Sequence, residues 1–207
     1  MLGLSRLFSK GGAALRIENE LKVKYVDFSK EYLSAIVDLA EERLGERYTT
    51  VEKLQAFIQD KNNACKLVVS EKDKKLQGFL FSHSSDILSL AAEMKITPEE
   101  IEKVIGRSGK IYVVKTLVLQ KEAEKHGLAT ELTRQGLETA KKLGFHSAWS
   151  ALWVKKDGSI PAKYIMERLG FTHYKTVHMR MYNRPDFKCL DCGGRCTCDS
   201  AIYYKIL

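Results

Sequence analysis

The stretch 111–143 constrains this chain most, because it reads as a buried strand that runs through a short polar loop into a helix. Residues 111–119 are mostly β-branched or aliphatic and predict the strand. After Gly127, apolar positions recur at helical spacing: Ala129, Leu132, Gly136, Ala140 and Leu143. The free N–H groups and the positive dipole end of this helix would lie above the strand, which favours a phosphate or pyrophosphate ligand.

Composition limits the classes of protein that this chain can be. Its 207 residues are 44% hydrophobic, enough for one domain with a full core. No apolar run approaches the length of a membrane span, so we expect no membrane partner. The net charge of +8 is spread over many lysines and favours an anionic partner such as a nucleotide cofactor. Nucleic acid is disfavoured, because no concentrated basic patch with interleaved aromatic residues is present.

The first half of the chain predicts the order strand, helix, helix, strand, strand. Residues 22–28 form the first strand, and Ser29 is expected to cap a helix that ends at Gly45. A second helix starts at Thr49, where Glu52 lies three residues on and predicts a capping box. Residues 65–70 and 76–83 form two strands joined by a polar hairpin turn.

The loop before the long helix carries a family resemblance. The run Glu124-Lys125-His126-Gly127-Leu128-Ala129 resembles the Q/R-x-x-G-x-G/A motif that binds acyl-CoA in the GNAT superfamily of N-acetyltransferases. Two positions depart from the motif: Glu124 replaces the leading Gln or Arg, and Lys125 replaces the usual glycine. The resemblance implies a mixed α/β (α+β) fold of GNAT type with splayed central parallel strands. It implies one domain over residues 21–207, after an N-terminal tail of residues 1–20.

The resemblance also implies the cofactor contacts. The CoA pyrophosphate would be held by the backbone of the loop and of the first helical turn: Glu124, Lys125, His126, Gly127, Leu128, Ala129 and Thr130. The pantetheine would lie between the strands 111–119 and 146–154, against the main chain of Leu117, Val118 and Leu119. The helix 161–169 resembles a second CoA-contacting pattern, N-x-x-A-x-x-x-Y-x-x-x-G-F, with Ala162 at the Ala position and Ser159 at the Asn position.

Catalytic residues are harder to assign. The family's Tyr, which protonates the departing CoA thiolate in many members, is replaced by Met166, and Tyr164 is the nearest alternative general acid. Family members often carry a Glu or His base on the first splayed strand, where this chain has Val113 and Lys115. No base follows from the sequence; a water-relayed proton, a residue of the insertion described next, His83 or His126 would serve.

An insertion of residues 84–110 separates the third strand from the cofactor-binding strand. It predicts a helix that starts at Thr97 with Pro98 at its first position and ends at Gly106, after a further turn or two at residues 86–94. We expect either a substrate wall near the acyl site or a peripheral embellishment.

Four cysteines cluster near the C-terminus, at Cys189, Cys192, Cys196 and Cys198. Their C-x-x-C and C-x-C spacings supply four thiolates, which predicts a structural Zn²⁺ site. Two disulfides, free thiols and iron–sulfur ligation are the alternatives; the isolated Cys65 favours a reducing compartment, and we expect a cytoplasmic protein. The cluster lies in residues 185–200, between strands expected at 171–182 and 201–207. There it would staple the last hairpin, or recognise a partner or cap the acceptor site.

The N-terminal residues 1–16 contain Arg, Lys and Ser but no acidic residue. This composition is typical of a mitochondrial transit peptide and also of a loose basic tail, and we favour the tail.

The function predicted from these features is transfer of an acetyl group from acetyl-CoA to a primary amine by direct attack on the thioester. Two alternatives remain: a non-catalytic acyl-CoA sensor or scaffold with the same fold, and a nucleic-acid or protein interaction module centred on the cysteines. The acceptor stays open between a small amine, a peptide N-terminus, a lysine and an antibiotic, and homodimerisation stays open as well.

Overall fold

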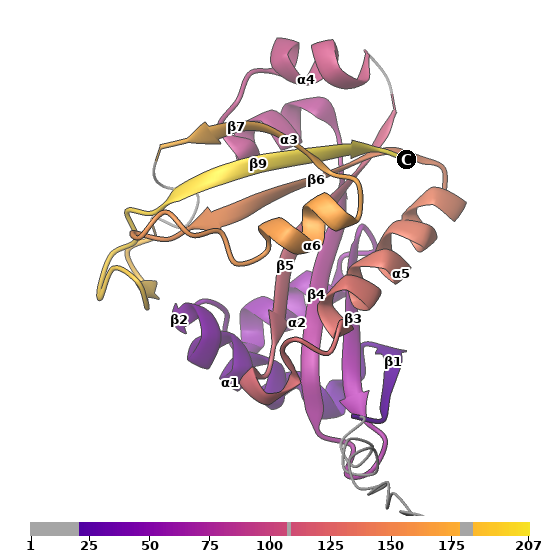
Figure 1. The fold of residues 1–207 in the computed structure, drawn as a ribbon, viewed down its shortest axis with the longest axis vertical. Helices are drawn as coiled ribbons and strands as arrows, with labels where there is room; N and C mark the ends of the chain where they lie inside the picture. Colours follow the sequence, from indigo (N-terminus) through magenta and orange to yellow (C-terminus); the bar gives the residue numbers. More distant parts are fainter. Residues whose placement is uncertain (1–20, 107–108, 179–183) are drawn as a thin grey trace, which may run out of the picture.

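A seven-stranded mixed sheet organises the chain, with strand order β1-β3-β4-β5-β6-β9-β7 (Figure 1). The computed structural model describes residues 21–106, 109–178 and 184–207, so the expectations for residues 1–20 lie outside the described part. The strands are β1 (Val23–Asp27), β3 (Asn63–Ser70), β4 (Leu76–Ser85), β5 (Lys110–Leu119), β6 (Phe145–Val154), β7 (Thr172–Val177) and β9 (Asp199–Ile206).

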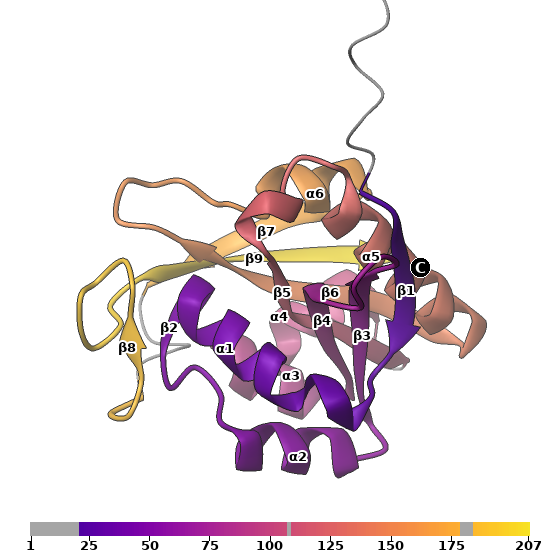
Figure 2. The same ribbon diagram turned by 90° about the horizontal axis from the view of Figure 1, so that it is seen from below.

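Helices cover both faces of the sheet. They are α1 (Leu33–Leu44), α2 (Val51–Gln59), α3 (Ile87–Met94), α4 (Pro98–Ile105), α5 (Leu128–Lys142) and α6 (Lys163–Arg168). Apolar residues of α5 and α6 share one core cluster with the sheet, whereas α1 and α2 form a second cluster with β3 and β4. The third cluster packs α3 and α4 against Ile111, Val113 and Trp149. Seen from below, α1 and α2 lie on the opposite side of the sheet from α6 (Figure 2).

The central parallel strands separate partway along their length. Residues Lys110 to Val113 of β5 pair with β6, and the pairing ends at Trp149. Beyond this point β4 continues to pair with β5 as far as Leu119, and β9 continues to pair with β6 as far as Val154. The two halves of the sheet therefore diverge between β5 and β6, which confirms the splay that the resemblance implied.

A second, two-stranded sheet joins distant parts of the chain. β2 (Gly45–Glu46) follows α1 directly and pairs antiparallel with β8 (Lys188–Cys189). A Cβ on Gly45 would lie 2.0 Å from the backbone oxygen of Lys188, so only glycine permits this approach. The pairing attaches the cysteine-rich segment to the end of α1.

The order of elements agrees with the sequence prediction, but two helix starts differ. Ser29 precedes a 3₁₀ turn, Lys30–Tyr32, without a side-chain cap, and α1 begins only at Leu33. The capping box predicted at Thr49 is wrong: the N-cap is Thr50, whose hydroxyl accepts from the Lys53 N–H at 3.3 Å. Since both positions are threonine, the sequence pattern alone did not fix the register of the cap.

The insertion contains two helices, with a complete capping box at the second. The Thr97 hydroxyl accepts from the Glu100 N–H, and the Glu100 carboxylate accepts from the Thr97 N–H at 2.8 Å. Pro98 occupies the first turn, as predicted. Two further expected elements are shorter than the sequence indicated, because α6 spans Lys163–Arg168 and β7 ends at Val177. Residues 179–182 of that strand prediction lie outside the described part.

Within the described residues, no helix has both the length and the apolar character needed to cross a bilayer.

Candidate active site

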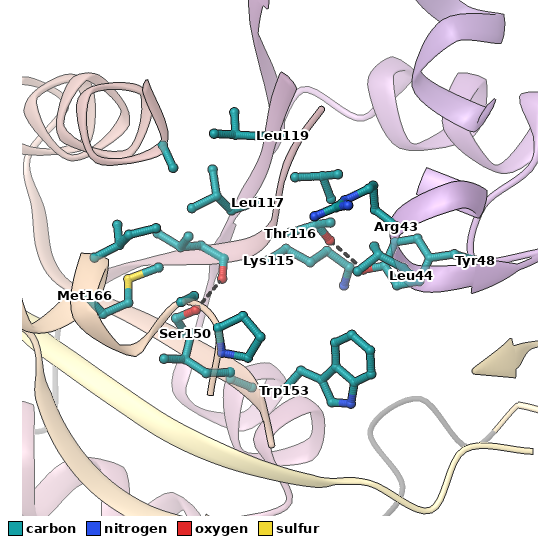
Figure 3. Close-up of a pocket in the computed structure, with 18 of the residues that line it drawn as sticks. Arg43, Leu44, Tyr48, Lys115, Thr116, Leu117, Leu119, Ser150, Trp153 and Met166 are labelled. Atoms are coloured by element: carbon teal, nitrogen blue, oxygen red, sulfur yellow. Dashed lines mark hydrogen bonds between the residues drawn. The ribbon is translucent and has the colours of Figure 1, made fainter. Parts of the chain in front are cut away.

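A cavity of about 530 Å³ occupies the splay between β5 and β6. Its walls include residues from both faces of the sheet. From the α5/α6 face come Leu117, Leu119 and Met166, and from the α1 side come Arg43, Leu44 and Tyr48 (Figure 3). At the closed end the buried Ser150 hydroxyl donates to the Val114 carbonyl at 2.9 Å, which bridges the two strands where they part. The opening therefore passes through the sheet.

A β-bulge in β5 determines which side chains face this cavity. Opposite β4, Phe81 pairs with Thr116 and Ser82 pairs with Val114, so Lys115 is the extra residue. The bulge turns Lys115 and Thr116 toward the same side of the sheet, since Lys115 Nζ lies 3.0 Å from Glu93 of α3 and Thr116 Oγ1 lies 2.6 Å from the Tyr48 hydroxyl. Burial raises the pKa of Tyr48, and the hydrogen bond with Thr116 opposes this shift.

At one end of the cavity lies the loop before α5, with Glu124 and Lys125 in the lining. Gly127 is the N-cap of α5 and adopts a left-handed φ of 77°, and Lys125 adopts a left-handed φ of 65°. The Glu131 N–H donates to the Gly127 carbonyl at 3.0 Å, and the N–H groups that precede Glu131 in the 15-residue helix α5 come before the first possible i→i−4 bond of the helix. Lys125 holds a conformation that glycine would adopt without strain, which accounts physically for the glycine usual at this motif position.

Several residues assigned to cofactor binding line the cavity. They are Leu117, Val118, Leu119, Glu124, Lys125, Ala129 and Ala162. The remaining assigned residues lie outside its lining: His126, Gly127, Leu128, Thr130 and Ser159. Ser159 is exposed, and its N–H donates to Asp157 Oδ1 at 2.9 Å. The Glu124 carboxylate pairs with the Arg43 guanidinium, so the acidic substitution in the motif is neutralised by a residue of α1.

The family follows from the sequence itself. A profile described as the Acetyltransferase (GNAT) family matches residues 31–171, more than half of the chain. The chain belongs to the GNAT acetyltransferase family. It is therefore an acyltransferase, and its seven-stranded mixed sheet has the arrangement of the GNAT fold.

Solved GNAT structures share the fold at low sequence identity. Arabidopsis thaliana NAA60 in complex with acetyl-CoA has a TM-score of 0.67 and 13% identity, and the match covers 90% of this chain and 99% of that one. The mosquito protein arylalkylamine N-acetyltransferase-like 5b has a TM-score of 0.61 and 15% identity, and the match covers 90% of this chain and 100% of that one. The ribosomal-protein-S18-alanine N-acetyltransferase from Escherichia coli has a TM-score of 0.59 and 13% identity, and the match covers 89% of this chain and 94% of that one. No curated protein matches the sequence.

In this GNAT domain the insertion contributes charge next to the cavity. The Glu93 carboxylate of α3 contacts His83 Nε2 at 2.9 Å and Lys115 Nζ at 3.0 Å. Burial on its own would raise the pKa of Glu93, but the hydrogen bond with His83 and the charge of Lys115 outweigh it and lower the pKa to about 2. Glu93 is thus an anion that holds Lys115 beside the splay, and it is too weakly basic to accept a proton from an amine.

On the other side of the cavity, α6 presents a thioether where many family members present a phenol. Met166 is 1% exposed and lines the cavity, so the residue at the Tyr position is correctly oriented but has no proton to donate. Tyr164, two residues earlier, is 70% exposed and points away from the lining. This position gives no support to the general-acid role expected of Tyr164.

The cysteine cluster is a compact group of four thiols. The Sγ atoms of Cys189, Cys192, Cys196 and Cys198 all lie within 4.8 Å of one another. Cys192 and Cys198 are 3.4 Å apart, and Cys189 and Cys198 are 3.9 Å apart, far beyond a disulfide bond. A tetrahedral site with Zn–S bonds of about 2.3 Å would place its sulfurs about 3.8 Å apart. The arrangement therefore fits four-sulfur coordination.

Some contacts in this cluster favour thiolate. The Thr197 N–H donates to Cys192 Sγ at 3.3 Å. Although burial raises the pKa of Cys192, the hydrogen bonds from Thr197 lower it to about 7. Burial raises the pKa of Cys196 to about 11 and also raises the pKa of Cys198, and it raises the pKa of the isolated Cys65 on β3 to about 12. Buried in that way, Cys65 is an inert core residue.

Sequence reasoning missed most of the cavity wall on the α1 side. Arg43, Tyr48, Trp153 and Phe187 all line the cavity, but none belongs to the motif that identified the family. Arg43 and Tyr48 flank the glycine that ends α1, a position that reads as a simple helix stop. The pairing of β2 with β8, which brings Phe187 to them, has no sequence signature of its own.

Proposed function

We propose that this GNAT acetyltransferase transfers an acetyl group from acetyl-CoA to a primary amine, by direct attack of the amine on the thioester. The observation that carries the proposal is the cavity, which opens through the sheet with the α5 loop at one end and a separate wall of Tyr48, Trp153 and Phe187 at the other. The acetyl-CoA complex of Arabidopsis thaliana NAA60, with the same fold, supports the choice of cofactor.

The cofactor half of the cavity has the groups that a nucleotide thioester needs. The N–H groups of Leu128, Ala129 and Thr130 begin α5 and would bind the pyrophosphate, with Lys125 supplying positive charge. The pantetheine would hydrogen-bond the main chain of residues 117–119 where β6 no longer pairs with it. Ala162 and Met166 of the α6 region would pack on its apolar arm, whereas Ser159 lies outside the lining.

The chemistry needs little from side chains. The amine nitrogen forms a bond to the acetyl carbon, the C–S bond breaks, and CoA leaves as a thiolate, while the proton of the former amine goes to water. A thiol pKa of about 8.5 makes the thiolate an adequate leaving group without an acid at Met166. Main-chain N–H groups at the bulge and the cation of Lys115 would stabilise the negative charge that develops on the carbonyl oxygen.

The test is an acceptor panel combined with a matched pair of glycine variants. Purified protein is incubated with acetyl-CoA and phenethylamine, spermidine or short peptides, and released thiol and a mass gain of one acetyl group on the amine are measured. Binding of acetyl-CoA with no release of CoA across the panel would instead establish the non-catalytic alternative.

Gly127→Val should abolish acetyl-CoA binding, because a side chain would stand at the N–H groups that begin α5. Gly144→Val is the control: both glycines have a φ of 77°, and no atom lies within 4 Å of an added Cβ at either site. The two variants should lose similar stability, roughly 1–2 kcal/mol, since both place a branched residue in a left-handed conformation. Equal acetyl-CoA affinity in both would refute the loop assignment.

We also propose a structural Zn²⁺ bound by Cys189, Cys192, Cys196 and Cys198. Residues 185–198 have little core of their own, and a metal would hold them folded. Protein purified under reducing conditions should contain one zinc per chain, and Cys192→Ser or a chelator should release it and lower the Tm. Cys65→Ala is the control and should retain the metal. A folded, reduced protein that never holds stoichiometric metal would eliminate this proposal, and iron in place of zinc would correct the identity of the ion.

A further inference from the structure

The cysteine cluster is part of the cavity wall. Cys189 and Cys196 line the cavity together with Phe187, which comes two residues before the first cysteine. These residues and Cys198 form one buried apolar cluster, against which Tyr48 and Trp153 pack. The rings of Tyr48 and Phe187 meet edge to face with centroids 5.8 Å apart. A metal at the cluster would therefore lie directly behind the side chains that shape one end of the cavity.

This end of the cavity lies opposite the cofactor loop. Alternate residues of β6 face opposite sides of the sheet, and Trp149, in the α3/α4 cluster, shares a side with Trp153. Leu152 packs on the other side, with α5 and α6. The Tyr48 hydroxyl contacts Thr116 Oγ1 at 2.6 Å, so this wall reaches the bulge, where Thr116 follows Lys115. The cysteine cluster thus adjoins the side from which an acceptor would approach the thioester.

Three further contacts tie the cluster to this wall. β8 pairs with β2, so Cys189 lies opposite Gly45, three residues before Tyr48. The Lys156 N–H donates to Asp191 Oδ2 at 2.6 Å, which fixes the loop after β6 to the segment between Cys189 and Cys192. Among the described residues the indole Nε1 of Trp153 is buried without a hydrogen-bond partner, and Trp153 packs against the cluster that contains Cys198. A metal-bound thiolate would accept from that indole N–H.

The charge of the cavity also limits the acceptor. The described lining contains the cations Arg43, Lys115, Lys125 and Lys155 and a single acid, Glu124, which Arg43 neutralises. A polyamine would meet the cations Lys125 and Lys155 in this lining, besides Lys115, which Glu93 pairs. The wall beside the bulge is made of aromatic rings and sulfur, which favour an apolar body attached to a single amine.

We propose that the metal-bound cysteine cluster forms the acceptor wall of the cavity, and that metal loading sets the affinity for an amine with an apolar body without setting the affinity for acetyl-CoA. The inference rests on the acetyl transfer proposed above. Metal removal would release Phe187 and Trp153 from their positions, whereas the α5 loop and residues 117–119 belong to other elements and would keep the cofactor site.

The experiment compares zinc-loaded protein, chelator-treated protein, Cys192→Ser and Phe187→Ala. Cys192 does not line the cavity, so its substitution acts through the metal, whereas Phe187→Ala removes the wall while keeping the four ligands. Acetyl-CoA affinity is measured by calorimetry, and KM is measured for phenethylamine, with spermidine as the polycationic comparison.

We expect acetyl-CoA affinity to stay within twofold in all four proteins. The KM for phenethylamine should rise at least tenfold in each of the three altered proteins, and spermidine should be a poor acceptor throughout. Unchanged phenethylamine kinetics after metal removal would overturn the proposal. A parallel loss of acetyl-CoA affinity would overturn it too, because the metal would then support the whole domain rather than one wall.

A second measurement does not need turnover. If zinc-loaded protein acetylates no amine in the panel, the proposed acetyl transfer is wrong. The distance between the metal and the acyl end of the cavity then tests whether the cysteine cluster forms this wall. Co²⁺ replaces Zn²⁺, and acetyl-CoA labelled with ¹³C at the acetyl methyl is bound. A paramagnetic shift of the methyl resonance relative to the Zn²⁺ protein supports a metal beside the acyl end of the cavity; an unshifted resonance overturns it.

Discussion

At the scale of single residues, Glu93 connects the insertion to the candidate active site. It is the anionic partner of both His83 and Lys115, and its side chain is 25% exposed. Its lowered pKa means that the ionised form of Glu93 is more favourable in the folded protein than in the unfolded chain. This contribution to stability is therefore fully present above the ordinary carboxyl pKa of 4.5 and is lost as the pH falls toward about 2.

Glu93→Gln should lower the free energy of unfolding at neutral pH by roughly 2 kcal/mol, because Lys115 loses its counter-charge. The difference from wild type should be constant above about pH 5 and shrink below about pH 4.5. Urea unfolding at a series of pH values measures it. Glu41→Gln, on the exposed side of α1, is the control and should change stability by less than about 0.5 kcal/mol at every pH. A loss of stability in Glu93→Gln that does not shrink in acid would contradict its origin in the ionised Glu93 carboxylate.

The residues found from the sequence and those missed differ in how they reach the cavity. Leu117, Val118, Leu119 and Ala129 line the cavity and lie on elements with clear periodicity, so the resemblance of those elements located them. Lys115 reaches Glu93 only because β5 bulges at that point, and the bulge shifts which side chains face the helices. Tyr164 lies two residues from the cavity-lining Met166 and therefore on another side of α6, where its side chain is 70% exposed.

At the scale of elements, the sequence predicted every strand of the large sheet and the six α-helices of the described residues, because most of them have a period and a start or stop signal of their own. It did not predict β2 and β8, which are two residues each and exist through their mutual pairing. The expectation that the cysteines lie at the tip of a simple terminal hairpin was incomplete for this reason. The segment is also attached to the end of α1, and that attachment makes it part of the cavity.

The corrected start of α2 is testable with adjacent threonines. Thr50→Ala should lower the free energy of unfolding by about 1 kcal/mol, because the Lys53 N–H loses its acceptor. Thr49→Ala should cost less than about 0.5 kcal/mol, since its hydroxyl makes only a 3.5 Å contact with the Thr50 carbonyl. Chemical denaturation of the two variants side by side measures the difference. The reverse order of costs would restore the cap predicted from the sequence.

At the scale of the whole molecule, the excess of cations matters for the cofactor. The chain has 34 Lys and Arg against 26 Asp and Glu, and its net charge is +8. A CoA thioester carries its negative charge on the nucleotide phosphates and none on the pantetheine arm or the acetyl group. The field of the protein should therefore act on the nucleotide end, and it should weaken as salt screens it over about 10 Å at 0.1 M and less at higher salt.

Raising the salt concentration from about 0.05 M to about 0.5 M should weaken acetyl-CoA binding roughly three- to tenfold. Acetyl-pantetheine, which has the same reactive end but no phosphates, is the matched ligand, and its weaker binding should be nearly independent of salt. Calorimetry with the two ligands separates long-range attraction from contacts inside the splay. If both ligands respond to salt equally, the effect belongs to the protein's own stability, and the +8 charge plays no part in cofactor capture.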